Sequence, residues 1–298
     1  MTTALPSRRR ATLIGFSAIA MWAALALLTT LAGPVPPFQL VAMAFAIPGT
    51  ASIALWVARG EGLRHLRQRP SVWALGIYGL FGYHFAYFVA LRAAPPVEAG
   101  LIAYLSPLLI VVFSSLLPGE RLRWYHLAGA LAGLAGTALV VTDGGRVAFK
   151  AEFALGYAAA FACALIWSSY SVLSRRFGEV PTTAVGGFCA VTAILAALCH
   201  VLLETTVWPA GGEWLAVLLL GIGPIGLAFF TWDVGMKHGD IQALGGLFYI
   251  APLGSTALLI LFGKGEASWI VGAATFLIVG GAALATLDVL RRQPGSQP

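Results

Sequence analysis

Long apolar stretches alternate with short polar segments along the whole chain. Each stretch has about 20 residues, the length that an α-helix needs to cross a bilayer core about 30 Å thick. Membrane-spanning β-strands would instead give segments of about ten residues with alternating polarity. The pattern therefore predicts an all-α integral membrane protein with ten transmembrane helices in a single membrane domain. The predicted spans are 11–32, 38–57, 71–91, 97–117, 124–142, 154–174, 181–203, 213–235, 241–262 and 268–288.

The second half of the sequence repeats the first at a constant offset of 145 residues (167 − 22 = 145). Five spans in each half make an odd number, so the second half must enter the membrane inverted relative to the first. An inverted repeat of this kind is the signature of a secondary transporter. We therefore expect a first five-helix repeat at 1–145 and an inverted second repeat at 146–298. The matching pairs include Trp22 and Trp167, Pro36 and Pro181, Tyr104 and Tyr249, Pro107 and Pro252, and Trp124 and Trp269.

The few charges of the chain are unevenly distributed between the two sides of the predicted topology. Charged residues make up 10% of the sequence and hydrophobic residues 59%, whereas a soluble domain carries about 25% charged residues. With the N-terminus inside, only Arg92, Arg146, Lys150 and Lys264 of the 18 Lys and Arg lie outside, which leaves 18 − 4 = 14 on the cytoplasmic side. This bias predicts that both termini are cytoplasmic. The basic residues are spread over separate short loops, so we expect no nucleic-acid partner.

Paired tryptophans and prolines point to a site near the middle of the membrane. Trp22 lies roughly 16 Å into its span at about 1.5 Å per residue, and its repeat mate Trp167 enters from the opposite face. Pro107 and Pro252 also lie near mid-span, where each removes one backbone hydrogen bond. Such a break is tolerated where protein or a water-filled cavity covers it. Plain helix packing and simple kinks are the alternatives, but repeat-paired breaks favour a shared site at the repeat interface.

Polar and aromatic side chains at this depth are candidates for substrate contact. His84 is an ionisable residue in the middle of the third span, which by default indicates function, although a satisfied packing histidine is the alternative. Its repeat position, 229, is Phe, so the two halves would line a pocket unequally. Six further tryptophans near span ends, Trp56, Trp73, Trp124, Trp208, Trp214 and Trp269, fit an interfacial belt. The candidate substrate-binding residues are Trp22, Tyr78, His84, Tyr87, Tyr104, Trp167, Ser168 and Tyr249.

Two charged pairs near span ends could act as gates or as ordinary ion pairs. Asp233 and Lys237 are four residues apart on one helix face, close to the cytoplasmic end of their span. Arg92 and Glu98 flank the outer loop 92–97 and could pair in the same way.

Two stretches resemble a known family of carriers. Segment 106–123, with Glu120, Trp124 and the glycines that follow, resembles the end-of-fourth-helix signature of EamA-type carriers in the drug/metabolite transporter superfamily. Segment 231–252 is similar to aromatic amino acid exporters of the YddG type. The resemblance implies a multi-pass protein of the bacterial inner (plasma) membrane that exports aromatic and other neutral amino acids.

The residues themselves narrow the substrate class. No predicted span carries a central Lys or Arg, which a phosphorylated substrate would need. A small zwitterion can instead place its ammonium on aromatic faces. We expect alternating access around an aromatic cavity at the midplane. An exporter of hydrophobic cations or drugs is the alternative, although no span has a central acidic residue. A passive scaffold has no specific support.

An intramembrane enzyme is the remote alternative. His84 and a serine could form a pair that Asp233 orients, but no Gly-x-Ser-x-Gly or His-Glu-x-x-His motif is present. We expect a protein that is not an enzyme and uses no metal or cofactor. Its expected partners are small-molecule substrate and membrane lipid. The glycines of Gly129-x-x-x-Gly133 permit close helix packing; we expect them to pack the fifth span inside the chain, in a monomer or weak dimer.

Overall fold

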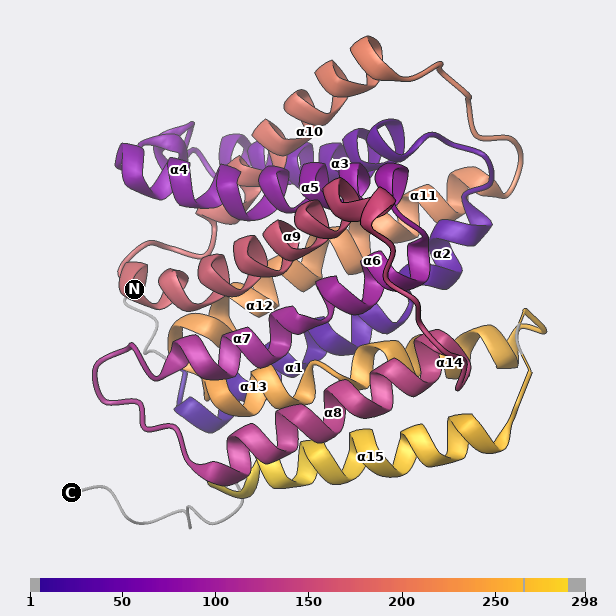
Figure 1. Ribbon diagram of the computed structural model, residues 1–298. Helices are drawn as coiled ribbons and strands as arrows, with labels where there is room; N and C mark the ends of the chain where they lie inside the picture. Colours follow the sequence, from indigo (N-terminus) through magenta and orange to yellow (C-terminus); the bar gives the residue numbers. More distant parts are fainter. Residues whose placement is uncertain (1–5, 265, 289–298) are drawn as a thin grey trace.

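The computed structural model describes residues 6–264 and 266–288, and all regular secondary structure in this part is helical (Figure 1). This confirms the prediction of an all-α protein. Nine helical segments of this part are long and apolar enough to cross a membrane. They are Arg8–Leu31, Pro37–Ala58, Pro70–Ala93, Pro96–Ser114, Trp124–Thr142, Ala151–Phe177, Ala184–Leu203, Glu213–His238 and Ile241–Leu261. A further apolar helix, α15 (Trp269–Ala285), has 17 residues.

Five of these segments are interrupted by a break or a π-helix, and one, Ala151–Phe177, begins and ends in a short 3-10 turn. Breaks in long helices have local causes such as proline, glycine or a π-bulge, and all three occur here. The elements are α1 (Arg8–Ala23), α2 (Leu25–Leu31), α3 (Pro37–Ala58), η1 (Arg64–Leu66), α4 (Pro70–Ile77), the π-helix η2 (Tyr78–Gly82), α5 (Tyr83–Ala93), α6 (Pro96–Ala103), α7 (Leu105–Ser114), α8 (Trp124–Thr142), η3 (Ala151–Phe153), α9 (Ala154–Ser174), η4 (Arg175–Phe177), α10 (Ala184–Leu203), α11 (Glu213–Ile222), the π-helix η5 (Gly223–Leu227), α12 (Ala228–His238), α13 (Ile241–Leu247) and α14 (Ile250–Leu261).

The 145-residue offset of the sequence recurs in the element boundaries. The π-helix η5 begins 145 residues after η2 (223 − 78 = 145), and α12 begins 145 residues after α5 (228 − 83 = 145). Two irregular turns at equivalent places show that the halves share local structure as well as sequence. π-bulges are often found at functional sites, and both of these lie in the middle of long helical segments.

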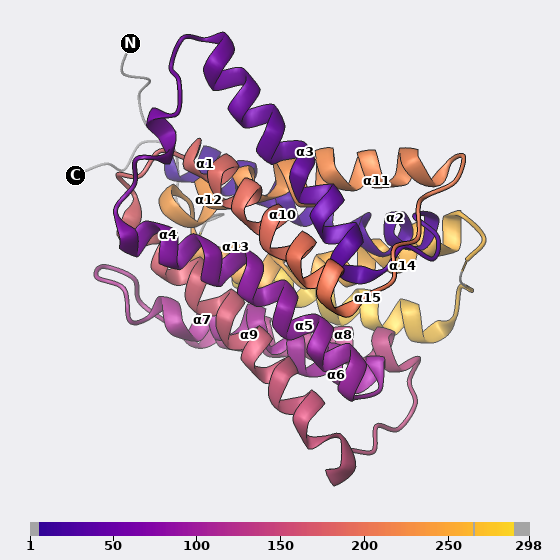
Figure 2. The same ribbon diagram turned by 90° about the horizontal axis from the view of Figure 1, so that it is seen from above.

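Equivalent helices of the two halves pack against each other. Helix α8 runs beside α15, and α3 beside α10 (Figures 1 and 2). A Cβ on Gly129 would lie 2.5 Å from the Gly281 carbonyl oxygen, so only glycine permits this approach of α8 to α15. This confirms the prediction that the Gly129 motif packs the fifth span inside the chain. The first and second halves therefore form one helical bundle.

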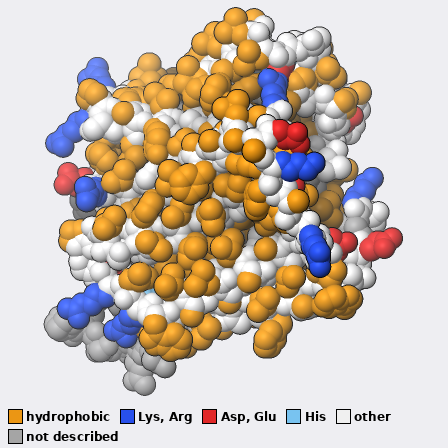
Figure 3. All heavy atoms as spheres, viewed as in Figure 1, with side chains coloured by type: hydrophobic (Ala, Val, Ile, Leu, Met, Phe, Trp, Pro, Cys, Tyr) orange, Lys and Arg blue, Asp and Glu red, His pale blue; other side chains and the backbone are white. Residues whose placement is uncertain are grey.

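The surface shows the pattern of a membrane protein. Hydrophobic side chains cover the middle of the face in Figure 3, and charged side chains gather toward two opposite edges. Trp124, Trp208, Trp214 and Trp269 are exposed, as expected for a belt. Trp56 departs from that expectation, because it is buried and its ring lies 5.0 Å from the His65 ring. Arg291 and Arg292, which contribute to the predicted charge bias, lie outside the described residues.

Candidate functional site

A cluster of aromatic rings occupies the centre of the bundle where the two halves meet. The ring centroids of Trp22 and Trp167 are 5.5 Å apart, edge to face. Trp232 lies 5.1 Å from Trp22 and stacks on Trp167 at 6.0 Å. We call these rings, with their neighbours, the central cluster. Its members are Trp22, Phe45, Tyr83, His84, Trp167, Phe229, Trp232 and Phe248.

The two central tryptophans differ in the hydrogen bonding of their indole groups. Trp22 donates its Nε1–H to the Pro224 carbonyl in η5 at 2.9 Å. Trp167 is only 4% exposed, and its Nε1 has no hydrogen-bond partner among the described residues. A buried polar group without a partner carries the full cost of its desolvation, about 1–3 kcal/mol. The indole N–H of Trp167 is therefore an unpaired donor at the centre of the bundle.

The His84 ring contacts residues of both halves, and one of its two nitrogens is engaged in a hydrogen bond. Its Nδ1 lies 2.7 Å from the Leu80 carbonyl, and because a carbonyl only accepts, Nδ1 carries the proton of that bond. The ring packs against Phe45 at 5.2 Å and lies 6.4 Å from Phe229. Asp233 lies elsewhere, bonded to Thr182 Oγ1 at 2.7 Å. The pairing of His84 with Asp233 that the enzyme alternative required is thus wrong.

The tyrosines assigned to the substrate have different environments. Tyr87 and Tyr104 are partly buried, and Tyr87 stacks on Tyr83 at 6.1 Å. Tyr249 is fully buried, and its hydroxyl accepts from the Leu108 amide at 3.2 Å and donates to the Tyr104 carbonyl at 3.1 Å. Leu108 and Tyr104 are the partners of one i→i−4 helical bond, so the hydroxyl is inserted into the helix beside Pro107. The structure places Tyr249 as a support of the broken helix.

The two breaks lie close to the prolines that predict them. Helix α6 ends at Ala103, and α7 begins at Leu105. Helix α13 ends at Leu247, before Pro252, and α14 begins at Ile250. Each break is within two residues of the carbonyl four positions before its proline, which the proline ring displaces.

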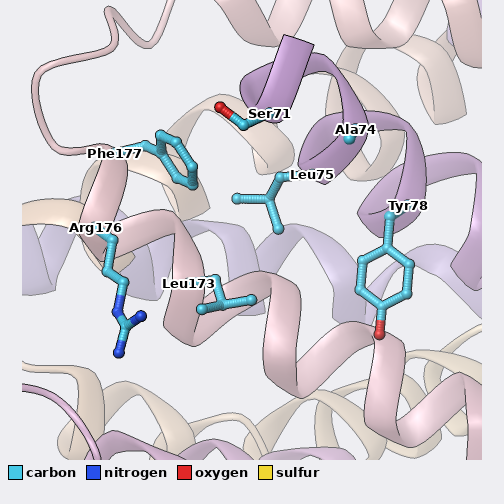
Figure 4. A pocket seen from close by; sticks show the side chains of 7 residues that line it. All are labelled: Ser71, Ala74, Leu75, Tyr78, Leu173, Arg176 and Phe177. Atoms are coloured by element: carbon cyan, nitrogen blue, oxygen red, sulfur yellow. The ribbon is translucent and has the colours of Figure 1, made fainter. Parts of the chain in front are cut away.

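Two candidate residues lie away from the central cluster. The Ser168 hydroxyl is buried and donates to the Ala164 carbonyl of its own helix at 2.8 Å. Tyr78 is 40% exposed, and its hydroxyl lies 2.9 Å from Ser169 Oγ. Tyr78 lines an open, mainly apolar pocket of about 520 Å³ between α4 and the end of α9, with Leu75, Leu173 and Phe177 among its walls (Figure 4). This pocket is on the flank of the bundle.

A network of ion pairs ties the two halves together near the start of α1. Arg8 Nη2 lies 2.9 Å from Glu120 Oε2 and 3.1 Å from Asp240 Oδ2. Arg175 Nη1 lies 2.9 Å from Glu120 Oε1, and its other nitrogens donate to the Met236 and Gly239 carbonyls. Arg8 and Glu120 belong to the first half, and Arg175 and Asp240 to the second. Each arginine pairs with a carboxylate of the other half. We call these four residues the Arg8 network.

The charged pairs considered from the sequence are partly different in the structure. Asp233 and Lys237 form an ion pair at 2.8 Å, and Lys237 also donates to the Val180 carbonyl. Arg92 pairs with Glu204 at 2.9 Å, so the expected Arg92–Glu98 pair is wrong. The Glu204 carboxylate also accepts hydrogen bonds from the Phe38 and Gln39 amides at the start of α3.

Several residues of the site were not singled out from the sequence. Phe229 and Trp232 were visible as the repeat mates of His84 and Tyr87, and that relation was the available signal. Tyr83 could have been found because it lies beside His84. Of the Arg8 network, the sequence singled out only Glu120, as part of the carrier signature, because the four charges lie in four separate segments. Among the described residues, no group of three or more His, Cys, Asp or Glu side chains could hold a metal ion.

A helical bundle whose two halves repeat the same elements around an aromatic centre fits the class of membrane transporters. The EamA-like transporter family matches residues 9–142 and 154–287, and the chain belongs to this family. It is thus a multi-pass membrane transporter and not an enzyme. The two matched segments correspond to the two halves of the repeat.

Named relatives extend over nearly the whole chain. The aromatic amino acid exporter YddG of Ancylobacter novellus is 60% identical over 94% of this chain and 98% of its own length. The exporter of the same name from Salmonella typhimurium is 25% identical over 95% and 99%. A probable terminal-alkyne amino-acid exporter of Streptantibioticus cattleyicolor is 23% identical over 82% and 84%. A solved crystal structure, 59% identical, covers 96% of this chain and 100% of its own, with a TM-score of 0.90.

Proposed function

We propose that this protein exports aromatic and other neutral amino acids across a bacterial inner membrane by alternating access. The relatives named as exporters of aromatic amino acids support the substrate class, because one of them is 60% identical over almost the full length. We take α15 as a tenth span, with the boundary between the repeats near residue 145. The termini are placed in the cytoplasm by the charge bias of the sequence.

The observation that carries the proposal is the unpartnered indole N–H of Trp167 inside the central cluster. The carboxylate of an amino acid would accept from this N–H, while Nε2 of His84, whose ring proton is on Nδ1, would accept from the ammonium. The ammonium would lie against aromatic faces, each worth about 0.5–2 kcal/mol. The partly buried Tyr87 and Tyr104 would contact the substrate side chain. The uncharged centre favours a zwitterion over a hydrophobic cation, because the buried Asp233 is already neutralised by Lys237.

The Arg8 network serves in this proposal as the cytoplasmic gate. It joins the ends of both halves through buried carboxylates, and Glu120 and Asp240 side chains are only 7% and 6% exposed. Opening that side requires Arg8 and Arg175 to leave the carboxylates of the opposite half. The Asp233–Lys237 pair lies within one helix, α12, and would not need to break for the halves to separate.

Transport by the purified protein in liposomes tests the proposal. Liposomes loaded with unlabelled phenylalanine should accumulate labelled phenylalanine by exchange, and unlabelled tryptophan should compete. Liposomes that contain Glu120→Gln protein, in which the gate is altered, should differ in exchange rate at equal protein content. Exchange of a lipophilic cation in place of phenylalanine would overturn the assigned substrate class.

A further inference from the structure

Near the centre of the bundle, certain hydrogen bonds form on one side of the repeat only. Their repeat-equivalent bonds on the other side are not formed among the described residues. Helix α1 packs on η5 and α9 packs on η2, so Trp22 and Trp167 have equivalent neighbours. Trp22 donates to the Pro224 carbonyl at 2.9 Å. The equivalent acceptor for Trp167 is the Gly79 carbonyl (224 − 145 = 79), but the Trp167 Nε1 has no partner in the described chain. The same contact is therefore formed on one side only.

The Tyr170 ring occupies the space beside Gly79. A Cβ on Gly79 would lie 2.2 Å from a carbon of that ring, so the ring packs directly on the bare backbone of the π-helix. The Tyr170 ring centroid also lies 5.6 Å from that of Trp167, so this ring packs against both the indole and η2. A movement of this ring would give the Trp167 indole access to the Gly79 carbonyl, and a buried donor without a partner favours such a movement.

A second pair of equivalent residues has the same one-sided bonding. The Tyr249 hydroxyl donates to the carbonyl of its repeat mate Tyr104 and accepts from the Leu108 amide. The mirror arrangement would have the Tyr104 hydroxyl donate to the Tyr249 carbonyl and accept from the amide of Leu253 (108 + 145 = 253). That arrangement is not formed among the described residues. Two independent pairs thus break the symmetry of the repeat at its centre.

We propose that the two halves exchange these hydrogen bonds during transport. In the state described here, Trp22 bonds Pro224 and Tyr249 bonds Tyr104, while the Arg8 network is closed. In the opposite state, Trp167 bonds Gly79 and Tyr104 bonds Tyr249, and Trp22 becomes the indole whose N–H is available to the substrate. Alternating access moves one repeat against the other around a fixed site, so contacts that the repeat makes equivalent can form in turn on the two sides. It rests on the alternating access of the proposed function.

The charged contacts differ between the two ends of the bundle. The positions equivalent to Arg8, Arg175 and Asp240 are Phe153, Thr30 and Pro95, so the Arg8 network is not repeated at the other end, where Arg92 of the first half pairs with Glu204 of the second. The uncharged central bonds are equivalent in the two states, whereas the Arg8 network is present in one. The Arg8 network therefore contributes to the balance between the states, and the indole and tyrosine bonds act as matched contacts in the two states.

Opposite effects of equivalent substitutions test the proposal. Spin labels at the exposed positions Arg121 and Glu179, on loops adjacent to Glu120 and Arg175, would report the distance across the Arg8 end in a variant without native cysteines. Trp22→Phe and Tyr249→Phe should each increase the population of longer distances by about two- to ten-fold. Trp167→Phe and Tyr104→Phe should decrease it. Adding Trp167→Phe to the Trp22→Phe variant should reverse the shift toward longer distances. This double variant reveals the effect of Trp167→Phe in a protein whose wild-type distances are already mostly short.

Trp73 provides the matched control. Its indole donates to the Leu66 carbonyl at 3.1 Å inside the first half, and its repeat position, 218, is Leu. Trp73→Phe should leave the distance distribution unchanged. Shifts of equal sign for Trp22→Phe and Trp167→Phe, or no shift in any variant, would overturn the exchange. The measurement needs no substrate, so its failure is separate from a failure of phenylalanine transport in liposomes.

Discussion

The Tyr249 hydroxyl donates a hydrogen bond to the backbone carbonyl of Tyr104, the residue that holds the equivalent position in the first half. The donor–acceptor distance is 3.1 Å, and the same hydroxyl accepts from the Leu108 amide at 3.2 Å. One side chain of the second half thus completes the helical hydrogen bonding of the first. Inside a membrane such groups need protein partners, because no water is available to bond them.

Removing this hydroxyl should destabilise the fold. Tyr249→Phe keeps the ring against Gly133 but leaves the Leu108 amide and the Tyr104 carbonyl without their bridge. We expect a loss of about 1–3 kcal/mol, the usual cost of unpaired buried polar groups, seen as a lower thermal midpoint in detergent. Tyr157→Phe is the control, because its hydroxyl only accepts a 3.4 Å bond near the surface. Equal midpoints for both variants would contradict the bridging role.

Glu120 should control access at the Arg8 end. Glu120→Gln removes the carboxylate that pairs with Arg8 and Arg175, and loss of one member of a buried pair commonly costs about 3–5 kcal/mol. We expect a cysteine at buried Ser174 to react faster with a water-soluble maleimide in this variant. Glu179→Gln, which changes an exposed acid, should leave the reaction rate unchanged. An unchanged reaction rate in the Glu120→Gln variant would show that the Arg8 network does not act as the gate.

The orientation can be measured with cysteines in two loops. Cysteines introduced at 60–68 should react only with reagent on the cytoplasmic side, and cysteines at 145–151 only with reagent outside. The physical reason is the excess of Lys and Arg on one side of the predicted topology. Intact cells labelled before and after permeabilisation would give the result. Labelling of both loops from outside would rule out ten spans with cytoplasmic termini.

The asymmetry between His84 and Phe229 should matter for substrate recognition. His84→Phe makes the two equivalent positions identical and keeps a ring against Phe45. We expect the fold to persist and the apparent affinity for phenylalanine to fall by about two- to ten-fold, the worth of one hydrogen bond. Transport kinetics in liposomes at several substrate concentrations would separate affinity from maximal rate. A normal affinity would leave His84 with a packing role only.

The sequence predicted the helical segments because each span is long and apolar and ends at polar or proline residues. The constant offset predicted equivalent structure, and the π-helices at Tyr78–Gly82 and Gly223–Leu227 follow it. The offset could not predict which of two equivalent residues makes a bond. Tyr104 and Tyr249 are the same residue type in nearly the same motif, and only the packing of the halves places one hydroxyl inside the other's helix.

The ion pairs were hidden from the sequence for a different reason. Arg8, Glu120, Arg175 and Asp240 lie far apart in the chain, and each is one of several charges near a span end. Spacing identifies pairs within one helix, such as Asp233 and Lys237, but not pairs between helices. Arg92 shows the same limit, since its partner Glu204 is 112 residues away while Glu98 is close in sequence.

Binding of L-tryptophan to the purified protein tests the central cluster most directly. Wild-type protein and Trp214→Ala, which changes an exposed tryptophan, should bind with similar affinity. Trp167→Ala should weaken binding by about 2- to 30-fold, the equivalent of one aromatic face at about 0.5–2 kcal/mol. Titration calorimetry in detergent, with thermal midpoints to verify folding, would supply the affinities. Wild-type affinity in folded Trp167→Ala, together with weakened binding in Trp214→Ala, would contradict a substrate site at the centre of the bundle.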